Sequence, residues 1–358
     1  MNRSKASAPS PELSAHRRAA LSRAGSKGQT ASARPFLKWV GGKRQLLGAL
    51  EAHLPREIRA GEPFSYLEPF LGAGAFFFHL RQAPGLQLTR ATLSDLNQDL
   101  LLTYQRLRRS PRMLIRRLTA LETLYLRAPT DQRRALYFAA REHFNELRGV
   151  PPARAQDTPP EEREVARALL LSSLERSPAG LHGERQRALT LAALFIFLNR
   201  TGYNGLYRVN QRGGYNVPYG RYRQPTICDA ARLRAAATAL SRVTLRALDF
   251  RSALRRVRPG AFVYLDPPYR PVSETANFHH YAAGGFGERE QRRLARFCRR
   301  VHEKGGWFLL SNSVSPDGFF ERLYEGFHFS KVPARRAVNR DPNGRGAVEE
   351  LLISNYLP

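Results

Sequence analysis

The stretch Val263-Tyr264-Leu265-Asp266-Pro267-Pro268-Tyr269 decides how the chain is expected to fold. Its β-branched and aromatic residues predict a buried strand, and the prolines end that strand because neither can donate to a sheet ladder. Asp266 and Tyr269 are therefore expected at the carboxyl end of a strand. In an open α/β sheet, this is the edge at which ligands bind.

The same stretch suits chemistry on a planar amine. The lone pair of such an amine is delocalised into its ring, so a carboxylate and a carbonyl must accept its N–H hydrogens to localise that pair. Asp266 offers the carboxylate, Pro267 offers the carbonyl, and the ring of Tyr269 offers a face on which a base stacks in line with an electrophilic methyl group. The alternative is a plain turn after a strand, since proline and aspartate are ordinary turn residues.

Composition narrows the class of partner. The 358 residues can form one large core and a smaller second domain, and 42% of them are hydrophobic. The net charge of +28 and the pI of about 11.1 favour a polyanionic partner, with nucleic acid first. An arginine-rich composition inherited from a GC-rich genome is the alternative explanation of this charge.

Cysteine usage and hydropathy predict a cytoplasmic, nucleoid-associated protein without metal. Cys228 and Cys298 have neither metal-ligand nor redox spacing, so we expect no zinc and no structural disulfide. No run approaches the roughly 18 apolar residues of a membrane span. The N-terminus also lacks a secretory hydrophobic core.

Residues 1–34 form a Ser-, Ala-, Arg- and Gly-rich tail with no apolar period. Such a segment cannot offset its ordering entropy, so it is expected to be a disordered basic tail. It either adds weak, non-specific affinity for DNA or is an inert extension. The folded chain then begins with an apolar and aromatic stretch at 35–43, broken by Gly41-Gly42, and a helix is expected over Arg44–His53.

The first strand, turn and helix of a Rossmann-like sheet are predicted at 65–78, where Gly72 and Gly74 allow the backbone to approach a nucleoside. A second strand, 91–94, leads into Asp95. An acid about 20 residues after a glycine turn is well placed to accept the two hydroxyls of a ribose. Alternatively, Asp95 caps the helix that begins near Gln98, and both roles are compatible.

The middle of the chain changes character twice. Residues 100–147 have helical apolar spacing, and 149–187 is a Pro-, Glu-, Ala- and Arg-rich insertion with a helix expected around 164–174. An apolar helix at 189–198 then leads into 199–222, where Arg, Asn and Tyr alternate with glycines and Gly213-Gly214 predicts a hairpin turn. These side chains can read base edges and wedge between base steps, whereas a solvated charged face is the alternative.

The last part of the chain alternates strands and helices. A strand from Arg242 ends in Asp249 and Phe250, which could hold the edge and face of a purine, although Asp249 could equally cap the next helix. A polar, aromatic loop at 273–286 is of the kind that closes over a substrate. A helix over 288–304 and strands over 307–311 and 349–356 complete a pattern that predicts a mainly parallel sheet.

Six motifs together resemble the Dam-type N6-adenine DNA methyltransferases, the D12 class or alpha group. They are Phe-Leu-Lys-Trp-x-Gly-Gly-Lys at 36–43, Glu-Pro-Phe-x-Gly-Ala-Gly at 68–74, Asn-Arg-x-Gly-Tyr-Asn-Gly-Leu at 199–206, Asn-Val-Pro at 216–218, Asp-Pro-Pro-Tyr at 266–269 and Thr-Ala-Asn-Phe at 275–278. The resemblance runs from about Phe36 to Tyr356, and the order of the motifs is that of the family. The chain differs in its longer insertion and at Val209, Gln211 and Gly214.

The resemblance implies a Rossmann-like sheet that binds S-adenosylmethionine, with an inserted, mainly helical DNA-recognition domain that carries a β-hairpin. It implies that the enzyme flips an adenine out of double-stranded DNA and methylates it, within GATC. The implied catalytic residues are Asp266, Pro267, Pro268 and Tyr269. The cofactor residues expected from the motifs and strand ends are Trp39, Lys43, Glu68, Phe70, Gly72, Gly74, Asp95, Asp249, Phe250 and Asp266.

For DNA, the resemblance places Lys38 at the first guanine, Tyr203 as a wedge and Asn204 at the orphaned partner base. The other DNA-contacting residues implied are Leu206, Arg208, Pro218, Arg221 and Tyr222. The expected layout is a catalytic domain at 35–104 and 240–358 and a target-recognition domain at 105–239. We expect a monomer in solution that binds DNA in one or more copies, without metal or membrane.

Two other classes of function fit parts of the sequence. The enzyme could act on another amine, such as cytosine N4, an RNA adenine or a protein glutamine, although the last would suit Asn rather than Asp at position 266. A catalytically silent DNA-binding relative would keep the fold alone. The carboxylate, the stacking ring and the glycine turn, all present, favour an active enzyme.

Overall fold

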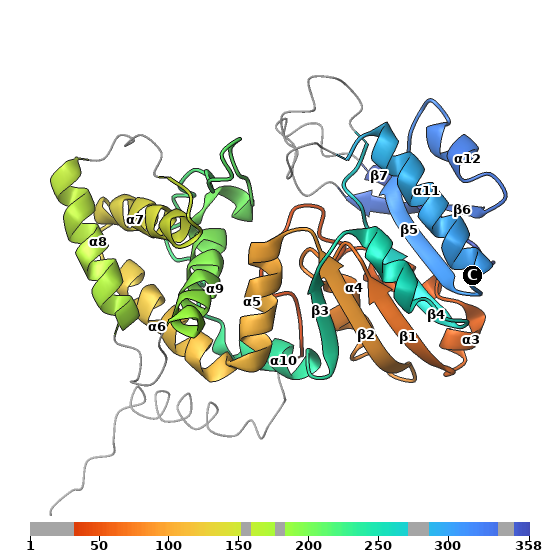
Figure 1. Ribbon diagram of the computed structural model, residues 1–358, viewed down its shortest axis with the longest axis horizontal. Coiled ribbons are helices and arrows are strands. Elements are labelled where there is room, and N and C mark those ends of the chain that lie inside the picture. The colour runs from red at the N-terminus through yellow and green to blue at the C-terminus, as the bar shows by residue number, and fades with distance from the viewer. Residues whose placement is uncertain (1–31, 152–158, 176–182, 271–285, 336–346) are drawn as a thin grey trace, which may run out of the picture. The chain divides into compact units, whose positions relative to one another are not determined.

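The computed structural model describes residues 32–151, 159–175, 183–270, 286–335 and 347–358 (Figure 1). The predicted basic tail, up to residue 31, lies outside these residues, as does most of the predicted 273–286 loop with its Thr-Ala-Asn-Phe motif.

A seven-stranded sheet with the order β3-β2-β1-β4-β5-β7-β6 is the centre of the fold. The first five strands in this order, β3, β2, β1, β4 and β5, pair in parallel, and β7 is antiparallel to both of its neighbours. The prediction of a mainly parallel α/β sheet is therefore confirmed. The strands are β1 Pro63–Glu68, β2 Gln87–Asp95, β3 Val243–Ala247, β4 Ala261–Leu265, β5 Trp307–Ser313, β6 His328–Arg335 and β7 Ala347–Ser354.

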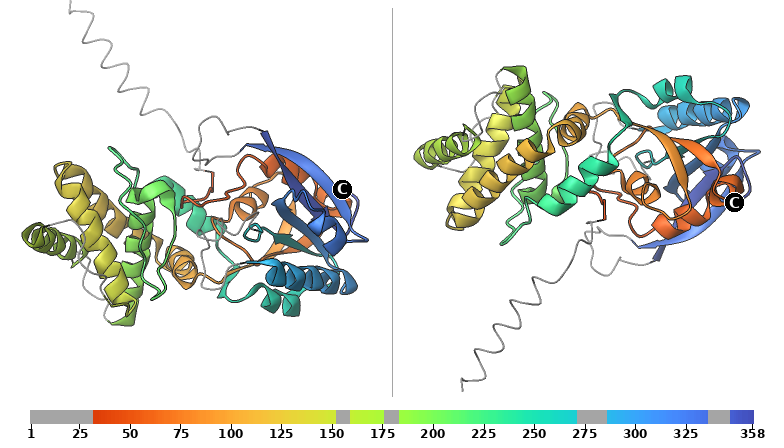
Figure 2. Two further views of the ribbon diagram at one scale, coloured as in Figure 1. Left: turned by 90° about the horizontal axis from the view of Figure 1, so that it is seen from above. Right: turned by 90° about the horizontal axis from the view of Figure 1, so that it is seen from below.

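Strand β4 is buried along its whole length because helices cover both faces of the sheet. Phe262 and Tyr264 belong to one hydrophobic cluster, whereas Val263 and Leu265 belong to the other. Helices α2 (Leu47–Ala52) and α4 (Ala75–Leu80) contribute to the first cluster. Helices η2 (Phe250–Arg256), α11 (Glu288–Glu303) and α12 (Phe319–Leu323) contribute to the second, and Figure 2 shows η2 and α11 on the opposite side of the sheet from α4.

Helix α9 (Glu184–Thr201) is the central element of the helical part of the chain. Almost every residue from Ala188 to Thr201 is buried, as expected for a helix that is apolar on all sides. It packs against three helices, α5 (Gln98–Arg109), α6 (Pro111–Arg127) and α7 (Gln132–Leu147). The remaining helices of the described residues are the short α3 (Arg56–Arg59), α8 (Pro160–Glu175) within the predicted insertion, the single turn η1 (Tyr203–Gly205) and α10 (Ala230–Ala239).

The segment 199–222 turns as predicted but forms no strand. Its pairing consists of two isolated bridges, Gly202↔Tyr219 and Val209↔Tyr215. At the turn, Gly213 has a φ of 78°, and the Asn210 side chain accepts hydrogen bonds from the N–H groups of Arg212 and Gly214. Glycine weakens strands, and an asparagine side chain competes for backbone donors, so the hairpin is a turn rather than a ladder.

Several predicted boundaries shift by a few residues. The first helix begins at Leu47 rather than Arg44, and the strand expected to reach Asp249 ends at Ala247. Strand β6 and helix α12 were not predicted. Strand β6 contains Pro333, which argues against a strand in general but is tolerated here because β6 lies at the edge of the sheet.

Candidate active site

The candidate site is a cavity of about 1230 Å³ at the carboxyl ends of β1, β2 and β4. These three strands are neighbours in the sheet, so the acids at or just after their ends, Glu68, Asp95 and Asp266, come together there. The structure brings every predicted cofactor and catalytic residue to this cavity. The lining includes Trp39, Lys43, Glu68, Phe70, Gly72, Gly74, Asp95, Asp249, Phe250, Asp266, Pro267, Pro268 and Tyr269.

The glycine turn after β1 lies directly against the ring of Trp39. Gly72 has a φ of 47°, and a Cβ atom there would lie 2.8 Å from two ring atoms of Trp39. Gly74, with a φ of 65°, precedes α4. Glycine is therefore required at 72 both for the backbone conformation and for the close approach of the indole.

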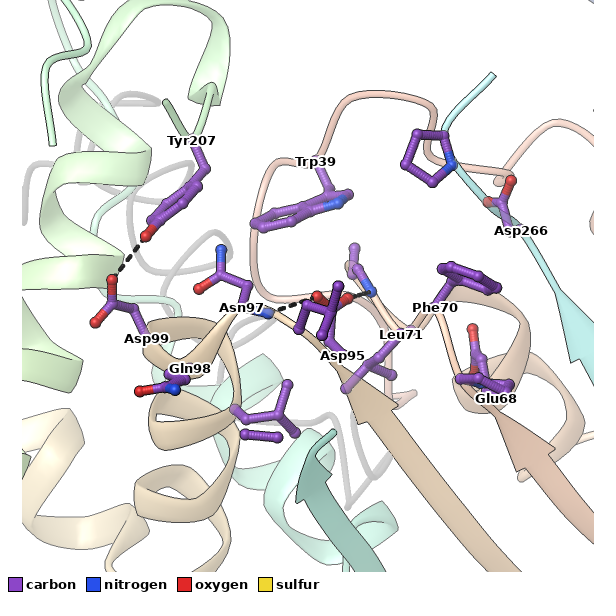
Figure 3. Close-up of a pocket in the computed structure, with 18 of the residues that line it drawn as sticks. Trp39, Glu68, Phe70, Leu71, Asp95, Asn97, Gln98, Asp99, Tyr207 and Asp266 are labelled. Atoms are coloured by element: carbon purple, nitrogen blue, oxygen red, sulfur yellow. Dashed lines mark hydrogen bonds between the residues drawn. The ribbon is translucent and has the colours of Figure 1, made fainter. Parts of the chain in front are cut away.

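Asp95 closes the turn through both of its carboxylate oxygens. One accepts the N–H of Gly72 at 3.0 Å and the other accepts the N–H of Asn97 at 2.9 Å (Figure 3). The side chain of Asn97, not that of Asp95, caps α5 by accepting the N–H of Leu100. The pKa of Asp95 is raised, because the effect of burial outweighs these backbone hydrogen bonds, which lower it.

Asp249 and Phe250 line the cavity, and Asp249 caps the next helix, which was one of its two predicted roles. The Asp249 side chain caps η2 by accepting the N–H of Arg251, and it also pairs with the Arg251 side chain at 2.7 Å. Phe250 is buried, and its ring stacks on Phe70 with centroids 5.4 Å apart. Phe286 meets the Phe70 ring edge-on at 5.6 Å, so three aromatic rings form this wall.

Asp266 belongs to a cluster of buried, charged groups. The ammonium of Lys43, only 5% exposed, lies 3.1 Å from an Asp266 oxygen and 2.6 Å from a Glu350 oxygen. It also donates to the hydroxyl of Tyr269 at 2.6 Å. The Tyr269 hydroxyl in turn donates to the carboxylate of Glu350, whose oxygens are both 2.8 Å away.

The charges of this cluster shift one another's ionisation. Burial raises the pKa of Asp266 to about 6, since the opposing attraction of Lys43 only partly offsets desolvation and Glu350 adds repulsion. Burial alone would lower the pKa of Lys43, but the charges of its partners, Asp266 first, raise it well above its ordinary value. Lys43 is therefore a permanent cation beside a carboxylate that titrates close to neutrality.

Glu350 was missed by the sequence analysis, which placed its segment in the final strand without a role in the site. The available signal was an acid directly before an apolar run, Leu351-Leu352-Ile353, whereas Asp266 comes directly after one. Only the antiparallel pairing of β7 with β5 shows where that acid points.

Glu68 completes an acidic lining. It is buried and accepts the hydroxyl of Tyr66 at 3.0 Å, and burial, followed by the charges of Asp266 and Asp95, raises its pKa. Three acids and the aromatic rings of Trp39, Phe70 and Phe250 thus face one cavity. This lining fits a ligand that combines an aromatic base, a ribose and a positive charge.

The predicted DNA-reading residues other than Lys38 lie on the segment after α9, residues 202–222, where exposed and buried side chains are mixed. Tyr203 is 52% exposed, and its N–H donates to the carbonyl of Pro218 at 2.8 Å. The N–H of Asn204 donates to the hydroxyl of Tyr222 at 3.1 Å, and the ammonium of Lys38 lies 4.0 Å from the centroid of the Tyr222 ring. Asn204 and Arg221 adopt left-handed backbone conformations, with φ of 51° and 54°.

Arg208 is held in place by its neighbour. Its guanidinium donates to the side-chain oxygen and the carbonyl of Asn216 at 2.8 and 2.9 Å. Arg208 is exposed, whereas Leu206 is half-buried. A planar guanidinium fixed through one edge is suited to bidentate recognition, because less of its freedom is lost on binding.

A chain of side chains links the cavity to this segment. Trp39 stacks on Tyr207 with centroids 6.4 Å apart, and the hydroxyl of Tyr207 donates to Asp99 at 2.7 Å (Figure 3). Asp99 also pairs with Arg148 at 3.0 Å. The sequence analysis did not identify Tyr207, Asp99 or Arg148 as part of the site, although all three line the cavity.

No helix in the described ranges is long and apolar enough to cross a membrane. Among the residues that the structure describes, no group of three or more His, Cys, Asp or Glu side chains could hold a metal ion. Cys228 and Cys298 are both free thiols.

The chain is similar to named DNA methyltransferases over most of its length. It is 37% identical to the Type II methyltransferase M.MjaIII of Methanocaldococcus jannaschii over 324 residues, which cover 90% of this chain and 99% of that protein. It is 33% identical to the Type II methyltransferase M1.LlaDCHI of Lactococcus lactis over 325 residues, which cover 90% and 95%. It is 31% identical to the DNA adenine methylase of Escherichia coli K12 over 320 residues, which cover 89% and 94%.

The sequence model of one family matches residues 39–338, a span that contains the glycine turn, the segment after α9 and the Asp-Pro-Pro-Tyr motif. Members of this family transfer a methyl group to adenine in DNA, which implies S-adenosylmethionine as the methyl donor. The chain therefore belongs to the D12 class N6 adenine-specific DNA methyltransferases.

Proposed function

We propose that this adenine-specific DNA methyltransferase flips the adenine of GATC out of the duplex and methylates its N6 through Asp266 and Tyr269. The observation that carries this proposal is the position of the Asp266 carboxylate, 3.1 Å from the Lys43 ammonium at the cavity formed by the strand ends. An amine that reaches this carboxylate must leave the base stack, since the cavity cannot admit an intact duplex.

The residues of the site fit S-adenosylmethionine, which supplies a methyl group on a positively charged sulfur. Asp95, whose oxygens each bind one backbone N–H, keeps acceptor capacity for the hydroxyls of a ribose. Trp39 and the Phe70–Phe250 pair offer aromatic surface for its adenine. The Asp266 carboxylate, ionised above about pH 6, favours its positive charges.

In the proposed reaction, Asp266 and the Pro267 carbonyl accept the two N6 hydrogens of the target adenine, and Tyr269 stacks on its ring. Localising the N6 lone pair lets it form a bond to the methyl carbon as the carbon–sulfur bond breaks and sulfur keeps the electron pair. The product nitrogen then loses one proton, which Asp266 is placed to accept.

We further propose that residues 105–239 are a target-recognition domain and that 199–222 contacts the DNA, with Lys38 from the start of the folded chain. Tyr203 is the proposed wedge, because it is a large exposed ring whose backbone is tied to Pro218. Leu206, Arg208 and Pro218 are the proposed base readers, and Asn204, Arg221 and Tyr222 flank them. The assignment to GATC rests on the resemblance of this segment to the Dam type.

Mapping the methylated base tests the proposal. Purified protein is incubated with S-adenosylmethionine and a duplex that contains one GATC site, and the digested DNA is analysed for N6-methyladenine, N4-methylcytosine and their positions. N6-methyladenine confined to GATC supports the proposal. N6-methyladenine at another sequence would contradict the GATC assignment alone, and modified cytosine would contradict the role given to the site.

A further inference from the structure

Glu350 is an acid in the interior of the sheet. Strand β7 lies between β5 and β6, and Glu350 pairs with Ser313 on one side and Val332 on the other. Glu350 is 6% exposed and precedes the buried run Leu351-Leu352-Ile353. A buried carboxylate costs stability unless charged and hydrogen-bonding partners surround it, so its place in the strand requires an explanation.

Three side chains use the carboxylate of Glu350. Lys43 donates to one oxygen at 2.6 Å, and the Tyr269 hydroxyl lies 2.8 Å from each oxygen. Ser311, on β5, donates to the same oxygen as Lys43. Glu350 therefore ties the lysine that contacts Asp266 to the ring that follows the Asp-Pro-Pro motif.

We propose that Glu350 is a positioning residue for methyl transfer, an inference that rests on the proposed function of Asp266 and Tyr269. It holds the Lys43 ammonium beside the Asp266 carboxylate, and it holds the far end of the Tyr269 ring in place through the hydroxyl. Neither effect requires Glu350 to touch the DNA or the methyl donor.

Lys43 reaches Tyr269 at the hydroxyl, 2.6 Å away, although its distance to the ring centroid is 4.7 Å. The ammonium thus engages the hydroxyl edge of the ring. A ring held at its hydroxyl by a cation and an anion has little freedom to swing about its Cα–Cβ bond, so it stays where a base can stack on it.

The charge of Glu350 also acts on Asp266. Its repulsion raises the pKa of Asp266, whereas the ammonium that it holds in place lowers that pKa. The titratable groups that influence Asp266, or are influenced by it, are Lys43, Tyr66, Glu68, Tyr264, Tyr269 and Glu350. From α11, Gln291 donates a hydrogen bond to the carbonyl of Pro268, and the charged residues Arg289 and Glu290 line the cavity.

The strand itself supplies a matched control. Glu349 precedes Glu350 and lies on the opposite face, where it is exposed and pairs with Lys331 at 3.6 Å. Changing Glu349 to Gln removes the same charge from the same strand without touching the cluster. The two variants therefore separate an effect of the cluster from an effect of net charge.

The test compares wild type, Glu350→Gln and Glu349→Gln at saturating S-adenosylmethionine and DNA. Single-turnover methylation rates are measured from pH 5 to 9, and S-adenosylmethionine affinity is measured by calorimetry. We expect Glu350→Gln to lower the rate about tenfold or more, which is about 1.4 kcal/mol of barrier, with cofactor affinity within about threefold of wild type. We also expect the acid limb of its pH–rate profile to move. It moves to lower pH if the lost repulsion by Glu350 dominates, and to higher pH if displacement of the Lys43 ammonium dominates, and either shift supports a link from Glu350 to Asp266. Glu349→Gln should match wild type.

A smaller loss of rate, an acid limb that stays in place, or a loss of cofactor affinity as large as the loss of rate would overturn the inference. If Glu350→Gln does not fold, Tyr269→Phe decides, since it keeps the half-exposed ring and removes only the hydroxyl. A wild-type rate in Tyr269→Phe overturns positioning through that hydroxyl, whereas a loss of about tenfold supports it. Wild-type protein that methylates no adenine would instead overturn the proposed function, which keeps the two failures distinct.

Discussion

The side chain of Asn199, near the end of α9, binds both backbone groups of Lys38. It accepts the N–H of Lys38 at 2.9 Å and donates to the Lys38 carbonyl at 2.8 Å. The same amide donates to the carbonyl of Gly205 at 2.9 Å. One buried side chain thus joins the start of the folded chain to the proposed DNA-reading segment.

Replacing Asn199 by Leu should leave these three buried backbone groups without their partner. We expect the free energy of unfolding to fall by about 1–3 kcal/mol, measured by urea denaturation, and DNA affinity to fall more than S-adenosylmethionine affinity. Asn355→Leu is the control, because Asn355 also binds a backbone N–H and a carbonyl, those of Phe308 and Gly306. Equal losses of DNA affinity in both variants would contradict a specific role for Asn199.

The contact between Gly72 and Trp39 can be tested separately from backbone strain. Ala at 72 places a Cβ 2.8 Å from the indole, whereas Ala at 85, where φ is also positive at 81°, meets nothing within 4 Å. Both variants should lose about 1–2 kcal/mol of stability because left-handed backbone disfavours a side chain. Only Gly72→Ala should weaken S-adenosylmethionine binding, by about tenfold or more in calorimetry. Similar binding by both variants would show that Trp39 does not line the cofactor site.

The raised pKa of Asp266 has opposite consequences for activity and stability. The methylation rate should rise with pH up to about 6 and then level, since the carboxylate must be ionised to accept the N6 hydrogens. Between pH 3.8, the ordinary pKa of the group in the unfolded chain, and about 6, its pKa in the folded protein, only the folded protein keeps the Asp266 proton. The contribution of Asp266 to stability therefore falls as the pH rises through this range.

The stability effect is measured as the difference in unfolding free energy between wild type and Asp266→Asn across that range. Wild type should become less stable relative to the variant as pH rises from about 4 to 6. A difference that grows in favour of wild type would mean that Lys43 outweighs burial and lowers the pKa of Asp266. Asp266→Asn should also lose methyl transfer, because an amide accepts the amine less well than a carboxylate.

Arg208 and Arg212 offer a contrast within one turn. Arg208, oriented by Asn216, is the proposed reader of a guanine, and its replacement by Ala should cost about 1–3 kcal/mol of discrimination at one base pair. Arg212 is exposed at the tip of the turn, so its replacement should weaken all duplexes alike. The measurement is kcat/KM on GATC and single-base variants at one salt concentration. A uniform loss for Arg208→Ala would place the guanine reader elsewhere.

Local sequence chemistry was enough to locate Asp266, Asp95 and the Gly72–Gly74 turn, because prolines, glycines and acids mark strand ends wherever the strands lie. Their meeting in one cavity followed from a parallel sheet. Glu350 could not be found in this way, since its role depends on which face of β7 meets β5, a contact between distant parts of the chain. Asn199 was also hidden, because a buried asparagine on an apolar helix does not reveal which backbone groups it binds.

The central claim is that Asp266 drives methylation of adenine N6 in GATC, and one measurement tests it most directly. Wild type and Asp266→Ala are incubated with radiolabelled S-adenosylmethionine and duplexes carrying GATC or a site in which the adenine is replaced, and circular dichroism checks that the variant is folded. The account predicts label on the adenine of GATC with wild type, and none with the replaced site or with Asp266→Ala. Activity of the folded variant within about tenfold of wild type, roughly 1.4 kcal/mol of barrier, would contradict it.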